Sequence, residues 1–206
     1  MPVTGDGDGL SVTSAARRAQ IVAATIETIA ELGYAQASFS RIAERAGLSS
    51  TRLISYHFAG KDDLIGAVVA DVYSAIAQFM AERMAGQTDA RGALRAYLSG
   101  VVEFIAGHPT QMRALMAVFL DFRAEDGGRS YDAASDRDAL GHVQEILRAG
   151  QASGEFREFD TFVMAATIQR SVDGLPFLLQ TKPDLDLRGY AEELVTLFDL
   201  ATRSQG

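Results

Sequence analysis

Residues 39–58 read FSRIAERAGLSSTRLISYHF, and their spacing is typical of two short helices joined by a tight turn. Small Ala43 would let the second helix approach the first closely, and Gly47 can take the left-handed backbone conformation that such a turn needs. Three larger apolar side chains are expected to fill the crevice between the helices: Ile42, Leu48 and Leu53. The segment therefore predicts a helix-turn-helix motif.

The second helix of this motif, expected at about residues 49–57, has an outward face that suits nucleic acid. The side chains on that face can all donate hydrogen bonds and none is negatively charged: Ser50, Thr51, Arg52, Ser55, Tyr56 and His57. The second helix of a helix-turn-helix can lie in the major groove of DNA. The motif therefore indicates DNA binding.

The net charge of the whole chain argues at first against this function. The 206 residues include 19 basic and 27 acidic side chains, a net charge of −8, and an acidic surface repels phosphates. The charges are unevenly distributed, however. Residues 14–61 contain six basic and three acidic side chains, a net charge of +3, whereas residues 62–206 have a net charge of −9 and residues 1–13 one of −2. The basic residues are thus concentrated around the predicted motif.

The remainder of the chain also has the apolar periodicity of helices, which predicts an all-α fold with about nine helices. Helices are expected at about residues 14–32, 38–45, 49–57, 61–84, 90–106, 109–122, 134–150, 161–179 and 187–202. Pro176, with Gly174 close by, predicts a kink inside the eighth of these. Residues 1–13 are expected to form a flexible leader, and residues 124–135 a mobile loop.

Four short motifs resemble the TetR/AcrR family of bacterial transcriptional regulators. They are SFSRIA at residues 38–43, AGLS at 46–49, YHF at 56–58 and KDDL at 61–64. The resemblance covers about 50 residues. It implies a three-helix DNA-binding domain at residues 14–60, followed at residues 61–206 by a larger helical domain for effector binding and dimerisation.

One departure from the family pattern affects the second helix of the motif. The interval between Gly47 and Phe58 is one residue longer than usual, and the glycine that normally follows the turn is absent. The family's recognition tyrosine could therefore correspond to Ile54, Ser55 or Tyr56.

The resemblance implies a role in DNA binding for individual residues. Ser38 and Ser40 would bind phosphate at the start of the first motif helix, and Tyr56, His57 and Lys61 would contact backbone phosphates. Arg52 would read guanine with two hydrogen bonds, while Ser50, Thr51 and Ser55 would make smaller groove contacts. Arg17 and Arg18 would touch the flanking backbone or the minor groove.

Each of these roles has a purely structural alternative. Arg52 could be a solvated helix residue, Tyr56 a packing residue and His57 a helix cap. Lys61 differs, because a cation at the start of a helix opposes the helix dipole, which favours a phosphate contact over a structural role.

In the C-terminal region, aromatic and methionine side chains recur at helical spacing, and most of them are expected to form the core. The resemblance implies that others line a cavity for a small, largely apolar effector. The candidates for this cavity are Tyr97, Phe104, His108, Met112, Met116, Phe119, Thr167 and Arg170. Arg170 could instead form an ion pair with Asp173, three residues further along the same helix face.

The sequence also excludes several classes of function. The chain has no cysteine and only three histidines, which predicts no metal site, and it contains no nucleophile–base motif or nucleotide-binding glycine loop that would indicate catalysis or a cofactor. No apolar stretch is expected to reach about 18 residues, so neither a membrane span nor a membrane partner is expected. The start of the chain does not resemble a signal peptide, and a cytoplasmic location is expected.

The sequence predicts a homodimeric repressor that a small-molecule effector releases from a palindromic operator in double-stranded DNA. The last two helices are expected to form the dimer interface through two apolar faces: Phe162, Ala166, Leu175 and Leu178 on one helix, and Leu194, Leu197, Phe198 and Ala201 on the other. Two alternatives remain open. One is a DNA-binding protein without a small-molecule effector, regulated by a partner protein, and the other is an all-α enzyme with His108 or His142 as its base.

Overall fold

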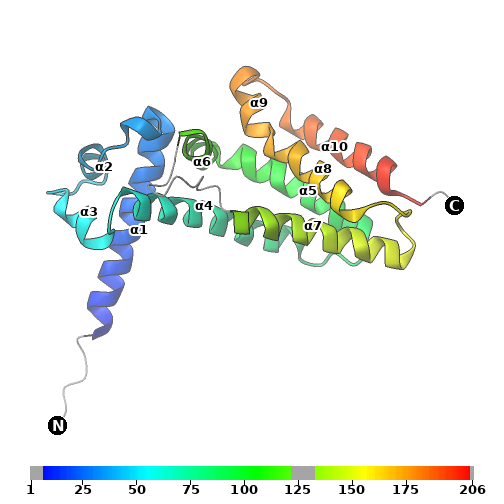
Figure 1. The fold of residues 1–206 in the computed structure, drawn as a ribbon, viewed down its shortest axis with the longest axis horizontal. Coiled ribbons are helices and arrows are strands. Elements are labelled where there is room, and N and C mark those ends of the chain that lie inside the picture. Colours follow the sequence, from blue (N-terminus) through cyan, green and yellow to red (C-terminus); the bar gives the residue numbers. More distant parts are fainter. Residues whose placement is uncertain (1–6, 122–132, 205–206) are drawn as a thin grey trace, which may run out of the picture. The chain divides into compact units, whose positions relative to one another are not determined.

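The computed structural model describes residues 7–121 and 133–204, with side chains for residues 12–121 and 139–204. Within these ranges the chain forms ten α-helices, one short 3-10 helix and no strand, so the predicted all-α class is confirmed (Figure 1). The elements are α1 (Gly7–Leu32), η1 (Tyr34–Gln36), α2 (Phe39–Arg45), α3 (Arg52–His57), α4 (Lys61–Met84), α5 (Ala90–Gly107), α6 (Pro109–Asp121), α7 (Ala133–Ser153), α8 (Thr161–Asp173), α9 (Leu175–Thr181) and α10 (Leu187–Thr202).

The helices pack into two compact units. Unit 1 comprises the described residues up to Val72 together with the part of α6 that begins at Thr110, and unit 2 comprises Tyr73–Pro109 and the described residues after position 132. The long helix α4 contributes its first half to unit 1 and its second half to unit 2. The predicted functional division into residues 14–60 and 61–206 stays a prediction.

Unit 1 is organised around α1, which packs against η1, α2 and α3 (Figure 1). Its core consists of side chains that are almost fully buried: Ile21, Ile29, Ile42, Ile54, Leu64 and Val68. Gly47 lies in the turn between α2 and α3 with a φ of 63°, a backbone conformation that favours glycine. This packing confirms the predicted helix-turn-helix.

Unit 2 is a helical bundle in which α5 packs against α7, α8, α9 and α10, and α7 packs against α8. Its core also consists of almost fully buried apolar side chains: Leu98, Phe104, Leu147, Ile168 and Leu175. Gly150 of α7 lies so close to the ring of Phe156 that a Cβ added there would be 2.1 Å from a ring carbon. The bundle thus depends on a glycine at this contact.

The helix α1 begins at Gly7, within the predicted leader at residues 1–13, and the flexibility of that leader stays a prediction. Residues 10–13 include no glycine or proline, and a helix that is nucleated further along the chain extends with one added hydrogen bond per residue. Residues 1–6 lie outside the described residues, as does most of the predicted loop at residues 124–135.

The expected helix at residues 161–179 is divided into α8 and α9, which raises the number of α-helices from nine to ten. The division falls at Gly174, and Pro176 lies within the first turn of α9. Proline suits a first turn because the N–H that it lacks would have no partner in the helix there. The kink predicted from these two residues is therefore a break between helices.

The length and composition of α4 would allow this helix to cross a membrane, and it is the one such helix among the described residues. The prediction that no apolar stretch reaches this length was wrong, because Asp71 is the only charged residue between Leu64 and Ala81. In the structure the apolar face of the first half of α4 lies in the core of unit 1, where Leu64, Val68 and Val72 are fully buried. A core helix passes the same test of length and composition, so the test is weak evidence for a membrane span.

Candidate nucleic-acid interface

The short helix α3 presents a polar face to solvent and one apolar side chain to the core. Arg52, Ser55 and Tyr56 are exposed, with Tyr56 80% exposed, whereas Ile54 is fully buried. The buried position excludes Ile54 as the residue equivalent to the recognition tyrosine and leaves Ser55 and Tyr56. The exposure of Tyr56 also argues against its alternative role as a packing residue.

The start of α3 differs from the prediction, because the helix begins at Arg52 and not near position 49. The Ser50 hydroxyl oxygen accepts a hydrogen bond of 3.0 Å from the backbone N–H of Arg52, so Ser50 and the half-buried Thr51 belong to the turn. The later start also changes which side chain faces the crevice: Ile54 fills it, and Leu53, predicted for that role, is only half buried.

The first motif helix, α2, begins with a side-chain cap. The Ser38 hydroxyl oxygen accepts a hydrogen bond of 3.4 Å from the backbone N–H of Arg41. A hydroxyl that accepts one bond still has a hydrogen to donate, so this cap is compatible with the predicted phosphate contact. Ser40 is exposed in the first turn of the same helix.

Lys61, at the start of α4, bonds to η1. Its ammonium group donates a hydrogen bond of 3.2 Å to the Tyr34 carbonyl and lies 4.1 Å from the centre of the Tyr34 ring. Partial burial lowers the pKa of Lys61, although the nearby Asp62 opposes this effect. Burial, followed by the charge of Asp62, raises the pKa of Tyr34. The helix-dipole argument therefore underestimated the structural role of Lys61.

Two side chains of α1 bond to carbonyl groups of the motif. Arg18 donates a hydrogen bond of 2.7 Å to the carbonyl of the half-buried His57, and its guanidinium lies 4.1 Å from the centre of the Phe58 ring. Gln20 donates a hydrogen bond of 2.7 Å to the Ala46 carbonyl. Arg17, the other predicted flanking contact, donates to the Gln20 side chain over 2.7 Å.

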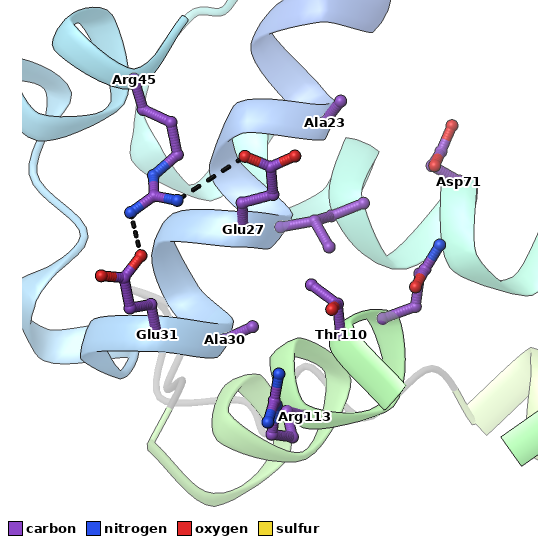
Figure 2. A pocket seen from close by; sticks show the side chains of 10 residues that line it. Ala23, Glu27, Ala30, Glu31, Arg45, Asp71, Thr110 and Arg113 are labelled. Carbon is purple, nitrogen blue, oxygen red and sulfur yellow. Dashed lines mark hydrogen bonds and ion pairs between the residues drawn. The ribbon is translucent and has the colours of Figure 1, made fainter. Parts of the chain in front are cut away.

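Arg45, at the end of α2, forms ion pairs with Glu31 and Glu27 of α1 (Figure 2). The hydrogen bond to Glu31 is the main cause that raises the pKa of Arg45. The two glutamates are one helical turn apart, so their carboxylates can reach the same guanidinium. The basic residues of the motif therefore include one whose charge is neutralised within unit 1.

These ion pairs border a polar pocket of about 790 Å³ within unit 1 (Figure 2). Its remaining lining comes from α1, α4 and α6: Ala23, Ile26, Ala30, Asp71, Thr110, Gln111 and Arg113. None of the eight effector residues predicted from the sequence lines this pocket. The paired glutamates of α1 are the sequence signal that could have indicated it.

The predicted effector residues belong to both units. Met112, Met116 and Phe119 lie on the part of α6 that packs in unit 1, and the other five lie in unit 2. Within unit 2 the His108 ring stacks on the buried Phe104 ring at 4.0 Å, and its Nδ1 lies 2.9 Å from the Phe104 carbonyl oxygen.

Three other predicted effector residues on α5 and α8 differ in burial. Tyr97 is buried and donates a hydrogen bond to Gln169, whereas Thr167 and Arg170 are exposed. Arg170 forms an ion pair of 2.7 Å with Asp173, which was the alternative considered for it.

Large apolar side chains are exposed on the helices predicted to form the dimer interface. They are Phe162 and Val163 on α8, Phe177 and Leu178 on α9, and Leu197 and Leu200 on α10. Three residues assigned to this interface from the sequence are instead buried in the core of unit 2, namely Leu175, Leu194 and Phe198. Among the described residues no group of three or more His, Asp or Glu side chains is placed to hold a metal ion.

Residues 21–68 match the family described as bacterial regulatory proteins, tetR family. These residues are similar to the TetR family. The match covers the C-terminal part of α1, all of α2 and α3, and the first turns of α4. The resemblance seen in the four short motifs is thereby confirmed.

A curated relative is the HTH-type transcriptional regulator BetI 1 of Chromohalobacter salexigens, which is 35% identical over 102 residues. The match covers 49% of this chain and 50% of the relative, so the chain spans about half the length of the curated relatives that it matches. Because these relatives are regulators, the comparison argues against an enzyme.

Two solved structures share the fold over most of the chain. A TetR transcription regulator from Haloarcula marismortui is 19% identical, with a TM-score of 0.81, and the match covers 92% of this chain and all of the other. The transcriptional regulator FadR from Bacillus subtilis, in complex with stearoyl-CoA, is 24% identical, with a TM-score of 0.73, and the match covers 87% and 96% of the two chains. At these identities the likeness establishes the fold of both units.

Proposed function

We propose that this protein is a sequence-specific DNA-binding transcriptional regulator, a repressor that leaves a palindromic operator when it binds a small-molecule effector. The observation that carries the proposal is the geometry of α3 within a domain similar to the TetR family. Its only fully buried side chain is Ile54, and its exposed face consists of hydrogen-bond donors without negative charge. A helix of this kind can enter a major groove and donate to base edges.

The proposed base contacts lie on α3. Arg52 is exposed, and within the described part of the chain its guanidinium has no hydrogen bond or ion pair, which suits a bidentate contact with guanine. Ser50, Thr51 and Ser55 are assigned smaller groove contacts. These residues would set the sequence preference.

The proposed phosphate contacts surround α3. Ser38 and Ser40 would donate from the first turn of α2, Tyr56 and His57 from the end of α3, and Lys61 from the start of α4. Lys61 has two more ammonium hydrogens besides the one donated to Tyr34, so both roles are compatible.

A second copy of the chain is the proposed cover for the exposed apolar side chains of α8, α9 and α10. A two-fold dimer would present two copies of α3 to successive turns of the major groove, which is why the operator is expected to be palindromic. The proposed location is the cytoplasm, where a bacterial regulator meets DNA.

A small-molecule effector is the proposed signal. The support is the fold shared with FadR, which was solved in complex with stearoyl-CoA. Linkage requires bound DNA to weaken effector binding by the same factor by which the effector weakens DNA binding, a coupling of about 1–3 kcal/mol. An effector that binds the DNA-free and the DNA-bound protein equally would contradict this mechanism.

The test of DNA binding starts from a pool of random duplexes, from which the wild-type protein selects its preferred sequence. We expect an enriched palindrome, and an affinity for it that falls steeply between about 50 and 200 mM salt. Enrichment of no sequence, or binding that salt leaves unchanged, would contradict the proposal.

The same selection experiment, together with a thermal-shift assay, distinguishes the two alternative functions. A regulator without a small-molecule effector would select a palindrome but show no thermal shift with a panel of apolar metabolites, including acyl-CoA. An enzyme with His108 or His142 as its base would select no sequence at all.

A further inference from the structure

The two α1 side chains that bond to the helix-turn-helix reach its two helix ends. Gln20 bonds to the carbonyl of Ala46, the C-cap residue of α2, and Arg18 bonds to the carbonyl of His57, the last residue of α3. Carbonyl groups in the last turn of a helix have no partner within the helix. Arg18 and Gln20, two residues apart on α1, thus each supply a hydrogen-bond donor to one such carbonyl.

The contact made by Arg18 suits a positioning role. One guanidinium nitrogen bonds to the His57 carbonyl at 2.7 Å, and the group lies over the ring of Phe58, which is 2% exposed. The backbone N–H of Phe58 in turn donates to the Ile54 carbonyl at 2.9 Å, which closes α3. A cation at a helix C-terminus is also favoured by the helix dipole. Arg18 therefore fixes the end of α3 by charge, hydrogen bond and ring contact.

The contact made by Gln20 is itself held in place. Its amide nitrogen donates to the Ala46 carbonyl, while its amide oxygen accepts a hydrogen bond of 2.7 Å from Arg17. Ala46 is buried and directly precedes Gly47, the turn residue with positive φ. The Arg17–Gln20 pair thus fixes the start of the turn.

Six residues form α3, too few for a helix that is stable by itself in water. Its orientation must therefore come from tertiary contacts, and bidentate base contacts tolerate little displacement. Ile54 anchors the middle of the helix, and at its start the Ser50 hydroxyl oxygen accepts a hydrogen bond from the backbone N–H of Arg52. The Arg18 bond is the contact that fixes its end.

We propose that Arg18 and Gln20 are positioning residues, which hold α3 in the orientation that reads DNA and do not themselves bind phosphate. The inference rests on the proposed DNA-binding function. It replaces the flanking DNA contact expected for Arg18 from the sequence, and it gives Arg17 a supporting role through Gln20.

The test compares wild type, Arg18→Ala and Gln20→Ala on two duplexes: the one that the wild type selects from a random pool, and a scrambled duplex of the same composition. We expect both variants to bind the selected duplex about tenfold or more weakly, because each loses a hydrogen bond that orients α3. Affinity for the scrambled duplex and the slope of log affinity against log salt should stay at their wild-type values. Gln20→Ala removes a hydrogen bond but no charge, so it separates the loss of orientation from the loss of a positive charge.

A phosphate contact by Arg18 would give a different pattern. The salt slope would become shallower by about 0.9, and both duplexes would lose affinity equally, because a phosphate contact contributes to the slope whatever the base sequence. That result would overturn the proposal for Arg18. Unchanged affinity of both variants for the selected duplex would overturn it for both residues.

A second measurement does not depend on DNA. Hydrogen exchange of the α3 backbone amides should accelerate in Arg18→Ala and in Gln20→Ala, while the core of unit 2 stays protected. The control is Arg52→Ala, which removes no bond to α1 and should leave the exchange rate of the α3 amides unchanged. If the wild type selects no duplex, the proposed function fails and this measurement alone still decides the positioning role. If the wild type selects a duplex but exchange is unchanged in both variants, only the positioning role fails.

Discussion

The phenol hydroxyl of Tyr97 on α5 donates a hydrogen bond to the side-chain oxygen of Gln169 on α8, and both side chains are buried in unit 2. The Gln169 amide nitrogen continues the chain by donating to Asp173 over 2.8 Å. Among the described residues no fully buried side-chain nitrogen or oxygen lacks a hydrogen bond. This network therefore links two helices of the bundle through a fully satisfied polar contact.

Removing the Tyr97 hydroxyl should destabilise the protein. Tyr97→Phe leaves the Gln169 oxygen buried without its donor, and we expect the free energy of unfolding to fall by about 1–3 kcal/mol. Urea denaturation measures this change. Tyr56→Phe is the matched control, because the exposed Tyr56 hydroxyl is solvated and its loss should change stability little. Equal effects of the two substitutions would contradict the role assigned to the network.

The same tyrosine should make stability depend on alkaline pH. Burial, and to a lesser extent the charge of Asp173, raises the pKa of Tyr97 above its ordinary value of 10.0. Above that value the unfolded chain loses the phenol proton while the folded chain keeps it, so this contribution to stability is present below pH 10 and falls as the pH rises further. The stability difference between wild type and Tyr97→Phe should therefore shrink from about pH 9 to 11. A difference that stays constant over this range would rule out the raised pKa.

Substitution at Gly150 should be costly because the added Cβ would overlap the Phe156 ring. We expect Gly150→Ala to lower the free energy of unfolding by about 1–3 kcal/mol, as overpacking does. Gly141→Ala on the same helix is the control. Apart from its chain neighbours and its own helix backbone, no atom of the described residues lies within 4 Å of a Cβ at Gly141, so this change should stabilise the helix by about 0.5–1 kcal/mol. Thermal unfolding of the two variants should thus shift in opposite directions.

Arg52→Ala should relax sequence preference without harming the fold. Loss of a bidentate guanine contact is expected to reduce discrimination at one base pair by about 1–3 kcal/mol, measured by competition between the selected duplex and its single-base variants. Since Arg52 has no side-chain bond within the described part of the chain, its thermal unfolding should match wild type. If discrimination at every base pair stays as in wild type, Arg52 does not read a base.

Leu197→Glu should weaken the proposed dimer. Leu197 is 57% exposed on α10, and a charge placed there would be desolvated at an apolar interface. Light scattering after size-exclusion chromatography should show the variant shifted toward monomer at concentrations where wild type is dimeric. Leu120→Glu is a control with similar exposure on α6. If both variants keep the wild-type mass, the α8–α10 surface is not the interface.

Local sequence patterns predicted the helix-turn-helix well. Small residues and one glycine at the turn are short-range signals, and Gly47 has the backbone conformation that its position predicted. The predicted inward face of the second motif helix was wrong because α3 begins at Arg52, after a turn in which Ser50 accepts a hydrogen bond from Arg52, and Ile54 faces the core. The phase of a six-residue helix depends on where it begins, and a run of serines and threonines offers several caps.

Contacts between distant residues were not predictable from the sequence. Lys61 bonds to a carbonyl 27 positions away and Arg18 to one 39 positions away, and both acceptors are backbone groups that every residue has. The polar pocket beside Arg45 likewise combines residues from α1, α2, α4 and α6. Spacing along one helix contains no information on such pairings.

The single buried side chain of α3 has a consequence for how this protein can diverge. The buried Ile54 contributes to the stability of the fold, whereas Arg52 and Ser55, which are proposed to read bases, are exposed. Substitutions at the exposed positions can therefore accumulate with little effect on folding. Under the proposed function, gene duplication followed by changes at Arg52 and Ser55 would give paralogues that keep the same scaffold and bind different operators.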